Sequence, residues 1–176
     1  MKKHIYRVLS VALCLLMLTG ILPAGLEMKA DALSVKYCGT AAAQWAKDHW
    51  DDTDSVLYGA GYFKNNNVGD GGDCANFVSQ CLYMGGLEQT PTWCYAGYRC
   101  HFTSNMGATW ITAHSLYNYL VSLGGQSIQN PSPSDVSVGD VIFYKTTDDG
   151  RMHHSAIVIA IENGTPIIAA HSAMEG

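Results

Sequence analysis

The chain has 176 residues, with ten lysines and arginines against fifteen aspartates and glutamates and a formal net charge of −5 at pH 7. Binding to nucleic acid or to an anionic membrane surface needs clustered basic side chains, and no basic run occurs after residue 32. Composition therefore argues against both functions, whereas a hydrophobic fraction of 48% suits a folded domain with one core.

The N-terminal segment has the pattern of a secretory signal peptide. Three basic residues among the first seven precede an apolar run from Val8 to Leu22, and Ala30-Asp31-Ala32 supplies the small residues that signal peptidase reads. An uncleaved membrane anchor is the alternative, but about 15 apolar residues fall short of the roughly 20 that span a bilayer as a helix. We therefore expect a signal peptide over residues 1–32, with cleavage after Ala32, and a secreted or cell-wall-associated protein.

The predicted mature domain covers residues 33–176, which is one domain by size. Four of the ten basic residues and two of the fifteen acidic residues lie in the signal segment, so six basic and thirteen acidic side chains remain, a net charge of −7. Five of the six cysteines also remain. An odd number of cysteines in an exported protein suggests at least one free thiol.

The first half of the domain predicts helices separated by irregular segments. Thr40 is a suitable N-cap for the first helix and Asp73 for the second, and a glycine pair follows both the second and the third. The helices expected are Ala41 to about Trp50, Cys74 to Met84, and Thr112 or Ala113 to Leu123. Residues 51–72 and 87–109 are expected to be loops.

The second half predicts strands. Asp140–Lys145 and Ser155–Ile161 are rich in β-branched and aromatic residues. Asn163-Gly164 is a strong signal for a tight hairpin turn, after which Pro166–His171 would form the returning strand. Helices followed by an antiparallel meander predict an α+β fold, with the helices packed on one face of a sheet.

The segment Gly71–Leu82 carries the clearest chemical signal. Cys74 lies in the first turn of the second helix, after a glycine-rich loop that leaves the backbone open to a substrate. Free N–H groups and the helix dipole favour an anion there, so we expect a lowered pKa for this thiol. A structural, buried cysteine is the alternative. That alternative suits Cys81, which a helical rise of about 10.5 Å separates too far from Cys74 for a disulfide bond.

Histidines near the last two strands could supply the base that a catalytic cysteine needs. His153 and His154 precede the strand Ser155–Ile161 and should point to opposite faces of it. We expect the face of His154 to look toward the start of the Cys74 helix. His171 lies in the returning strand, where it could hold the imidazole of His154 through a ring hydrogen bond.

Together these segments resemble the putative amidase domain family of Gram-positive bacteria, within the papain-like superfamily of NlpC-type and CHAP-type cysteine amidohydrolases. The resemblance covers roughly residues 40–173, and its cysteine motif is its most specific part. The matching segments are Asp73-Cys74-Ala75-Asn76-Phe77-Val78-Ser79-Gln80-Cys81-Leu82 with Gly85-Gly86, Trp110 ahead of Leu116-Tyr117-Asn118-Tyr119-Leu120, Gly139-Asp140-Val141-Ile142, His154-Ser155-Ala156-Ile157-Val158 and Ala170-His171-Ser172.

The resemblance implies a papain-like fold and a catalytic triad of Cys74 as nucleophile, His154 as general base and His171 as the residue that orients the base. It also implies an oxyanion hole made by the Cys74 N–H and one further donor. Tyr62 and Tyr58 are both candidates for this donor, and Asp73 and Trp110 are further candidates for the cleft. The reaction implied is hydrolysis of amide bonds through a thioester acyl-enzyme, without a cofactor, in peptides or peptidoglycan.

Members of such families usually continue into at least one further strand, whereas this chain ends five residues after His171, so we expect a domain truncated at its C-terminus. Three alternatives stay open. The first is an acyltransferase that uses the same triad. The second is a zinc site at Cys94, Cys100 and His101, or at the three histidines named above, although neither has the paired spacing of structural zinc sites. The third is a non-catalytic secreted module held by disulfides, for which Cys94 and Cys100 are the candidate pair.

Overall fold

The computed structural model describes residues 4–8, 37–51, 73–95, 107–145 and 148–171. Several predicted features lie outside these residues: the cleavage site after Ala32, the loop over residues 52–72, Tyr58, Tyr62, Cys100 and His101. Among the helices of the described residues, none is long and apolar enough to cross a membrane.

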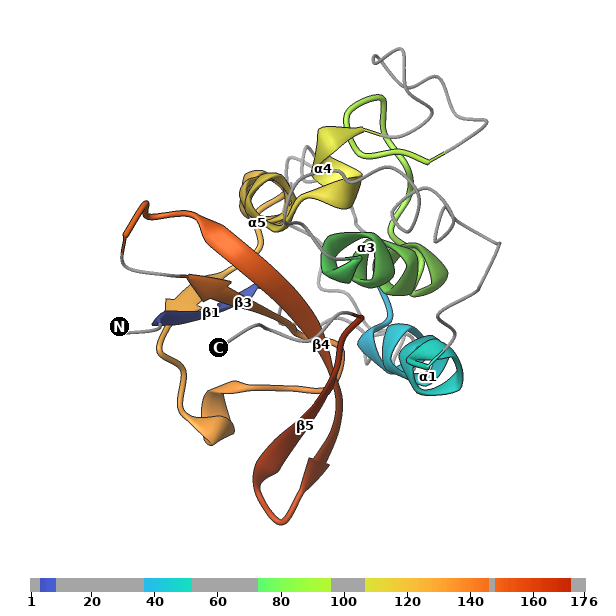
Figure 1. The fold of residues 1–176 in the computed structure, drawn as a ribbon. Coiled ribbons are helices and arrows are strands. Elements are labelled where there is room, and N and C mark those ends of the chain that lie inside the picture. Colours follow the sequence, from blue (N-terminus) through green and yellow to red (C-terminus); the bar gives the residue numbers. More distant parts are fainter. Residues whose placement is uncertain (1–3, 9–36, 52–72, 96–106, 146–147, 172–176) are drawn as a thin grey trace, which may run out of the picture.

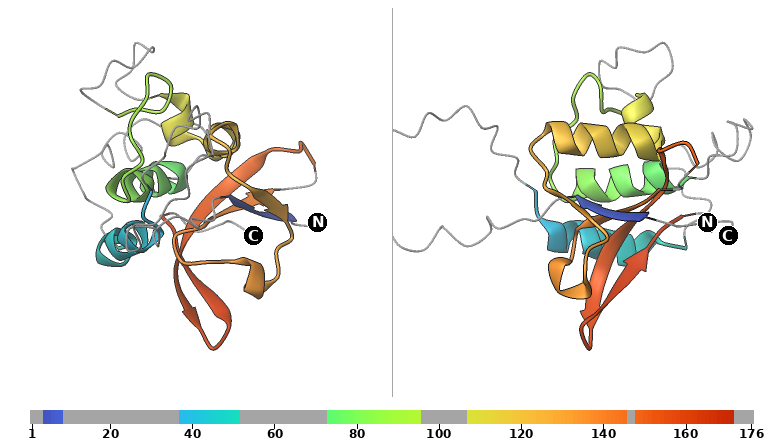
Figure 2. Two further views of the ribbon diagram at one scale, coloured as in Figure 1. Left: turned by 180° about the vertical axis from the view of Figure 1, so that it is seen from behind. Right: turned by 90° about the vertical axis from the view of Figure 1, so that its left-hand side faces the viewer.

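The described residues form helices packed on one side of an antiparallel sheet. The helices are α1 (Gly39–His49), α3 (Cys74–Met84), α4 (Ala108–Ile111) and α5 (Ala113–Ser122), with a short 3-10 helix, η2, at Pro133–Asp135. The strands are β1 (His4–Val8), β2 (Ser127–Gln129), β3 (Val141–Lys145), β4 (Met152–Glu162) and β5 (Thr165–Ala169), in the order β2-β1-β3-β4-β5 (Figure 1). Helices α5, α3 and α1 lie beside one another in a layer (Figure 2). The predicted α+β class is confirmed.

The hairpin between β4 and β5 forms at the predicted Asn-Gly pair. Asn163 and Gly164 both have positive φ, 50° and 78°, which a two-residue hairpin turn of this type requires at both central positions. Glu162 and Thr165 are the last paired residues on either side. Strand β5 ends at Ala169, so His171 lies just beyond the strand in which it was expected.

The two faces of the sheet pack against different partners. Val141, Phe143 and Ile157 belong to the main core, which they share with the buried residues of α1, α3 and α5. Ile142 and Val158 point to the opposite face, where they form a small cluster with Val136 and Tyr144. The odd-numbered positions in the middle of β4 therefore face the helices, and the even-numbered positions face away from them.

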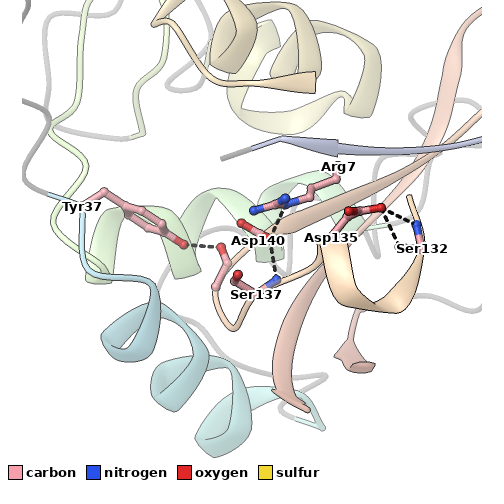
Figure 3. Close-up of polar contacts among 7 residues, drawn as sticks. Arg7, Tyr37, Ser132, Asp135, Ser137 and Asp140 are labelled. Carbon is pink, nitrogen blue, oxygen red and sulfur yellow. Dashed lines mark hydrogen bonds and ion pairs between the residues drawn. The ribbon is translucent and has the colours of Figure 1, made fainter. Parts of the chain in front are cut away.

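A buried ion pair joins β1 to the turn before β3. Arg7 Nε donates to Asp140 Oδ2 at 2.5 Å, and the two side chains are 9% and 2% exposed (Figure 3). Asp140 Oδ2 also accepts the Ser137 N–H at 2.7 Å. Burial raises the pKa of Asp140, while the Ser137 hydrogen bond and the Arg7 guanidinium oppose that rise. The carboxylate therefore depends on Arg7 to stay ionised inside the fold.

A hydrogen bond and a close backbone contact join the turn before β3 to the start of α1. The Tyr37 hydroxyl donates to the Gly139 carbonyl at 2.7 Å (Figure 3). Gly139 has a φ of 89°, and a Cβ there would lie 2.2 Å from the Gly39 Cα. Only glycine fits this approach of two backbones, which fixes α1 against the sheet.

Strand β1 lies within the segment for which the sequence predicts a signal peptide. Its residues pair with β2 on one side and β3 on the other. Cleavage after Ala32 would remove this strand and Arg7 from the sheet. The cleavage itself stays a prediction.

Replacing Arg7 by Met in the full-length chain should lower the free energy of unfolding at pH 7 by about 3 kcal/mol, because a buried carboxylate would lose its partner. The pKa of Asp140 is higher in the folded state than in the unfolded state, so ionisation of this carboxyl destabilises the fold. The full cost applies above the folded-state pKa, and there is no cost below the unfolded-state pKa. The loss should therefore shrink as the pH falls from 7 to 4.

Urea denaturation at both pH values measures this effect. Arg151→Met, at an exposed position, is the control and should change the free energy of unfolding by less than about 0.5 kcal/mol. If Arg7→Met has no effect, β1 is absent from the sheet of the purified protein, which is the state that cleavage after Ala32 would produce.

Candidate active site

Cys74 is the first residue of α3, as predicted. The Phe77 N–H donates to the Asp73 carbonyl at 2.9 Å and closes the first helical turn. Every residue from Cys74 to Leu82 is buried, so this helix has no solvent face over its first nine residues. The thiol is only 4% exposed, and it is free rather than disulfide-bonded. The nucleophile candidate therefore lies in a largely desolvated position at a helix start.

Burial dominates the ionisation of this thiol. Desolvation is the largest influence on the pKa of Cys74 and raises it, and the Asp73 carboxylate raises it further. The nearby N–H and hydroxyl of Ser155 and the Ala75 N–H lower this pKa, but by less. The prediction of a lowered pKa is therefore wrong, because the helix start does not compensate for the loss of water. At neutral pH the thiol is protonated, so nucleophilic attack needs a base.

His154 lies on the face of β4 that points away from the helices. It pairs across the sheet with Tyr144, and the two ring centroids are 5.6 Å apart. Ser155, the next residue, contacts the thiol instead. The prediction that the His154 face looks toward the start of α3 is wrong, because Ile157 fills the core on the helix side and the pleat alternates from there.

The imidazole of His154 is nevertheless suited to accept a proton. Burial lowers the pKa of His154, so the neutral form predominates at neutral pH. Among the described residues its ring nitrogens have no hydrogen-bond partner. His153, by contrast, is exposed, and its Nε2 lies 2.8 Å from Asp149 Oδ1.

His171 is held at the start of α3, not at His154. Its Nδ1 lies 2.8 Å from Asp73 Oδ2, and its Nε2 lies 3.0 Å from the His49 carbonyl oxygen. Its ring stacks on Phe77 with centroids 4.1 Å apart. A carbonyl and an ionised carboxylate can only accept hydrogen bonds, so this arrangement suits an imidazolium that donates from both nitrogens. The predicted hydrogen bond from His171 to His154 is not formed.

A chain of hydrogen bonds fixes the Asp73 carboxylate from the other side. Asn76 Nδ2 donates to Asp73 Oδ1 at 2.8 Å, and Asn76 Oδ1 accepts the Trp110 indole N–H at 2.8 Å. Ser79 donates to the Trp110 carbonyl at 2.9 Å and accepts the Trp93 indole N–H at 3.1 Å. Trp110 is fully buried, and its place among the cleft candidates stays a prediction. Its role here is to hold two polar side chains of α3.

Asp73 also differs from its predicted role as a cap. It occupies the N-cap position, but its carboxylate makes no capping hydrogen bond to the helix backbone. Both carboxylate oxygens are used by the side chains of Asn76 and His171 instead. Asp73 therefore links α3 to the segment that follows β5.

The structure tests the prediction for Cys81 but only part of the prediction for Cys94. Cys81 is fully buried and free, as predicted for a core thiol, and burial raises its pKa. Cys94 is disulfide-bonded, whereas its predicted partner Cys100 lies outside the described residues, so the pairing stays a prediction. Within the described part of the chain, no three histidine, cysteine, aspartate or glutamate side chains are grouped as metal ligands.

Sequence reasoning missed two residues of this site. The sequence predicts Ser155 only as part of a strand and of the motif that begins at His154, and it predicts Asn76 only as part of the cysteine motif. A signal for Asn76 was present, because polar residues at positions 76 and 79 interrupt an otherwise apolar helix and need buried partners. Ser155 offered no such signal, since its contact depends on which face of β4 meets α3.

Replacing Asp73 by Ala should destabilise the protein by about 2 kcal/mol, because His171 and Asn76 both lose a largely buried charged acceptor. Asp73→Asn should cost less, since one oxygen remains. Asp48→Ala is the control, because Asp48 is exposed and bonds only to the exposed Gln44 among the hydrogen bonds described. Urea unfolding measures all three variants, and equal losses for Asp73→Ala and Asp48→Ala would contradict the linking role of Asp73.

Comparisons with known proteins identify one family and two similar sequences. The family model described as "Putative amidase domain" matches residues 36–175. The uncharacterized proteins YhbB and YjcM of Bacillus subtilis strain 168 are each 28% identical to the chain, over 149 and 156 residues. Both matches cover 83% of this chain, but only 45% of YhbB and 34% of YjcM, so the chain spans less than half of either relative.

No solved structure matches the chain. The family match covers most of the sequence, from a residue just before α1 to the end of the described fold. The general activity that this family's description indicates is the hydrolysis of amide bonds. The chain therefore belongs to the putative amidase domain family.

Proposed function

We propose that the protein is a cysteine-dependent amidase of papain-like type, in which Cys74 is the nucleophile and His154 the general base. The observation that carries this proposal is a free thiol at the first residue of a buried helix, with donors from Ser155 and Ala75 directed at its sulfur. The same arrangement would be costly in a purely structural helix, because it keeps polar groups around a desolvated sulfur.

The reaction proceeds by acyl transfer to water. His154 takes the thiol proton while the sulfur attacks the amide carbonyl, and the negative charge moves onto the carbonyl oxygen. The imidazolium then protonates the leaving nitrogen, the C–N bond breaks, and a thioester on Cys74 remains. Water, deprotonated by the same imidazole, attacks the thioester and releases the acid and the free thiol.

The two histidines suit different roles. Both ring nitrogens of His171 are engaged by Asp73 and the His49 carbonyl, so this imidazole is poorly placed to accept a proton. The neutral, desolvated imidazole of His154 is available. In the free protein it points to the face of β4 away from the helices, so the proposal requires the start of β4, which β5 does not pair before Ile157, to shift together with this side chain when substrate binds. Catalytic hydrogen bonds often form only in the complex with substrate.

We take peptide bonds of peptidoglycan stem peptides as the substrate class and the outside of the cell as the place of action. The support is the family match together with the signal-like N-terminus. The predicted mature domain carries a net charge of −7. An anionic wall would repel this charge, so recognition must come from specific contacts.

Digestion of purified peptidoglycan, followed by mass spectrometry of the released fragments, tests the activity. A hydrolase releases fragments with a new carboxyl group and a new amine in equal amounts. An acyltransferase with the same residues would instead give products joined to an added amine. Release of the same fragments in equal amounts by Cys74→Ala and by the parent chain would contradict the proposal.

Substitutions of the cysteines and histidines should separate their roles. Cys74→Ala should abolish release of fragments with little change in stability, while Cys81→Ala should keep activity and lose about 1 kcal/mol or more of stability through lost packing. His154→Ala should lose nearly all activity and His153→Ala little. His171→Ala should be intermediate, with His171→Asn milder. The measurement is kcat/KM of each variant on one amide substrate. An active His154→Ala together with an inactive His171→Ala would mean that His171, and not His154, is the general base.

The pH profile gives an independent check on the base. The neutral form of His154 is needed, and burial lowers its pKa, so kcat/KM should stay high down to a pH below about 6.5, the ordinary pKa of imidazole. An acid limb centred above 6.5 would mean that the base is not a desolvated histidine.

A further inference from the structure

The hydroxyl of Ser155 is an unusual group in the core of this protein. Ser155 is fully buried, and its Oγ has no hydrogen-bond partner that meets ordinary geometry among the described residues. Buried hydroxyls are nearly always paired, because losing water without a replacement is unfavourable. An unpaired buried hydroxyl that faces a candidate nucleophile suggests a partner that arrives with the substrate.

The position of this hydroxyl is set by the sheet. Ser155 pairs with Phe143 across β3 and β4, on the face that packs against the helices. Its N–H and its hydroxyl both act on the Cys74 sulfur, together with the N–H of Ala75 from the helix start. Two elements far apart in the sequence therefore direct donors at one atom.

We propose that the Ser155 hydroxyl is a catalytic donor that stabilises the oxyanion formed when Cys74 attacks a carbonyl. This inference rests on the proposed function. The oxyanion is two bonds away from the sulfur, so groups that already contact the sulfur lie within reach of it. Donors placed where charge develops lower the barrier to acyl transfer. Ser155 and the free N–H groups at the start of α3 would then form the oxyanion hole.

A simpler role must be separated from this one. A hydroxyl beside the sulfur could merely stabilise the thiolate before the reaction. Two small reagents distinguish these roles without knowledge of the natural substrate. 4-Nitrophenyl acetate acylates the sulfur through an oxyanion: the S–C bond forms, 4-nitrophenolate leaves, and the thiol proton passes to the base or to solvent. Iodoacetamide alkylates the same sulfur by direct displacement of iodide, with no oxyanion.

The experiment compares the rates of both reactions at Cys74 in the full chain, with each modification located by peptide mass spectrometry. Cys38→Ser is the background, because Cys38 is a partly exposed cysteine that is not disulfide-bonded. Ser155→Ala should lower the ratio of acylation to alkylation by roughly tenfold or more, since loss of one oxyanion donor has effects of this order. Ser155→Thr retains a hydroxyl and should restore much of the ratio.

Ser79→Ala is the matched control, because Ser79 is also a fully buried serine but bonds to Trp110 and Trp93 instead of the sulfur. It should leave the ratio unchanged. The inference is overturned if Ser155→Ala leaves the ratio unchanged, whether both rates fall together or neither falls. Failure of the proposed function would give a different result: Cys74→Ala would then release 4-nitrophenolate from the ester as fast as the parent chain.

Discussion

Burial of α3 on every side is the constraint on which the site depends. A helix without a solvent face needs partners for its polar side chains inside the protein, and among the described residues only Gln80 Oε1 of this helix is buried without one. Trp110 meets this requirement twice, with its indole N–H for Asn76 and its carbonyl for Ser79. The remaining donor of Asn76 then holds the carboxylate of Asp73, which in turn holds His171. The packing of α3 thus fixes the polar groups beside the nucleophile as well as the nucleophile itself.

The burial of Cys74 and that of His154 decide when charge would appear during the proposed reaction. Burial raises the pKa of Cys74 and lowers the pKa of His154, so both groups rest in their neutral forms. A preformed pair of thiolate and imidazolium would need a more polar site. In the proposed mechanism, charge therefore develops only as a substrate is attacked, and it ends on the carbonyl oxygen. Donors near the sulfur are then of greater value in the transition state than in the free protein, which is the condition for catalysis.

Local signals in the sequence predicted what depends on local chemistry. The bounds of α3, its glycine stop, the Asn-Gly hairpin and the strand character of β3 and β4 all follow from a few neighbouring residues. The short helix α4 begins in the segment 87–109 that was expected to be irregular and runs two residues past it, and it was not predicted because four residues carry almost no helical signal of their own. Strand β2 was missed for a similar reason, since three residues become a strand only by pairing with β1.

The choice between faces and partners was beyond such signals. Both faces of β4 are apolar, so the residue pattern could not tell which face meets the helices. Because neighbouring residues of a strand point to opposite faces, this choice also decides whether His154 or Ser155 points toward the helices. Strand β1 shows the same limit in another form. A basic residue near an N-terminus suits an export signal, while in the sheet that residue, Arg7, neutralises the buried Asp140. A processed domain cannot use Arg7 in this way. Strand β2 would lose its partner as well, because β1 lies between β2 and β3 in the sheet.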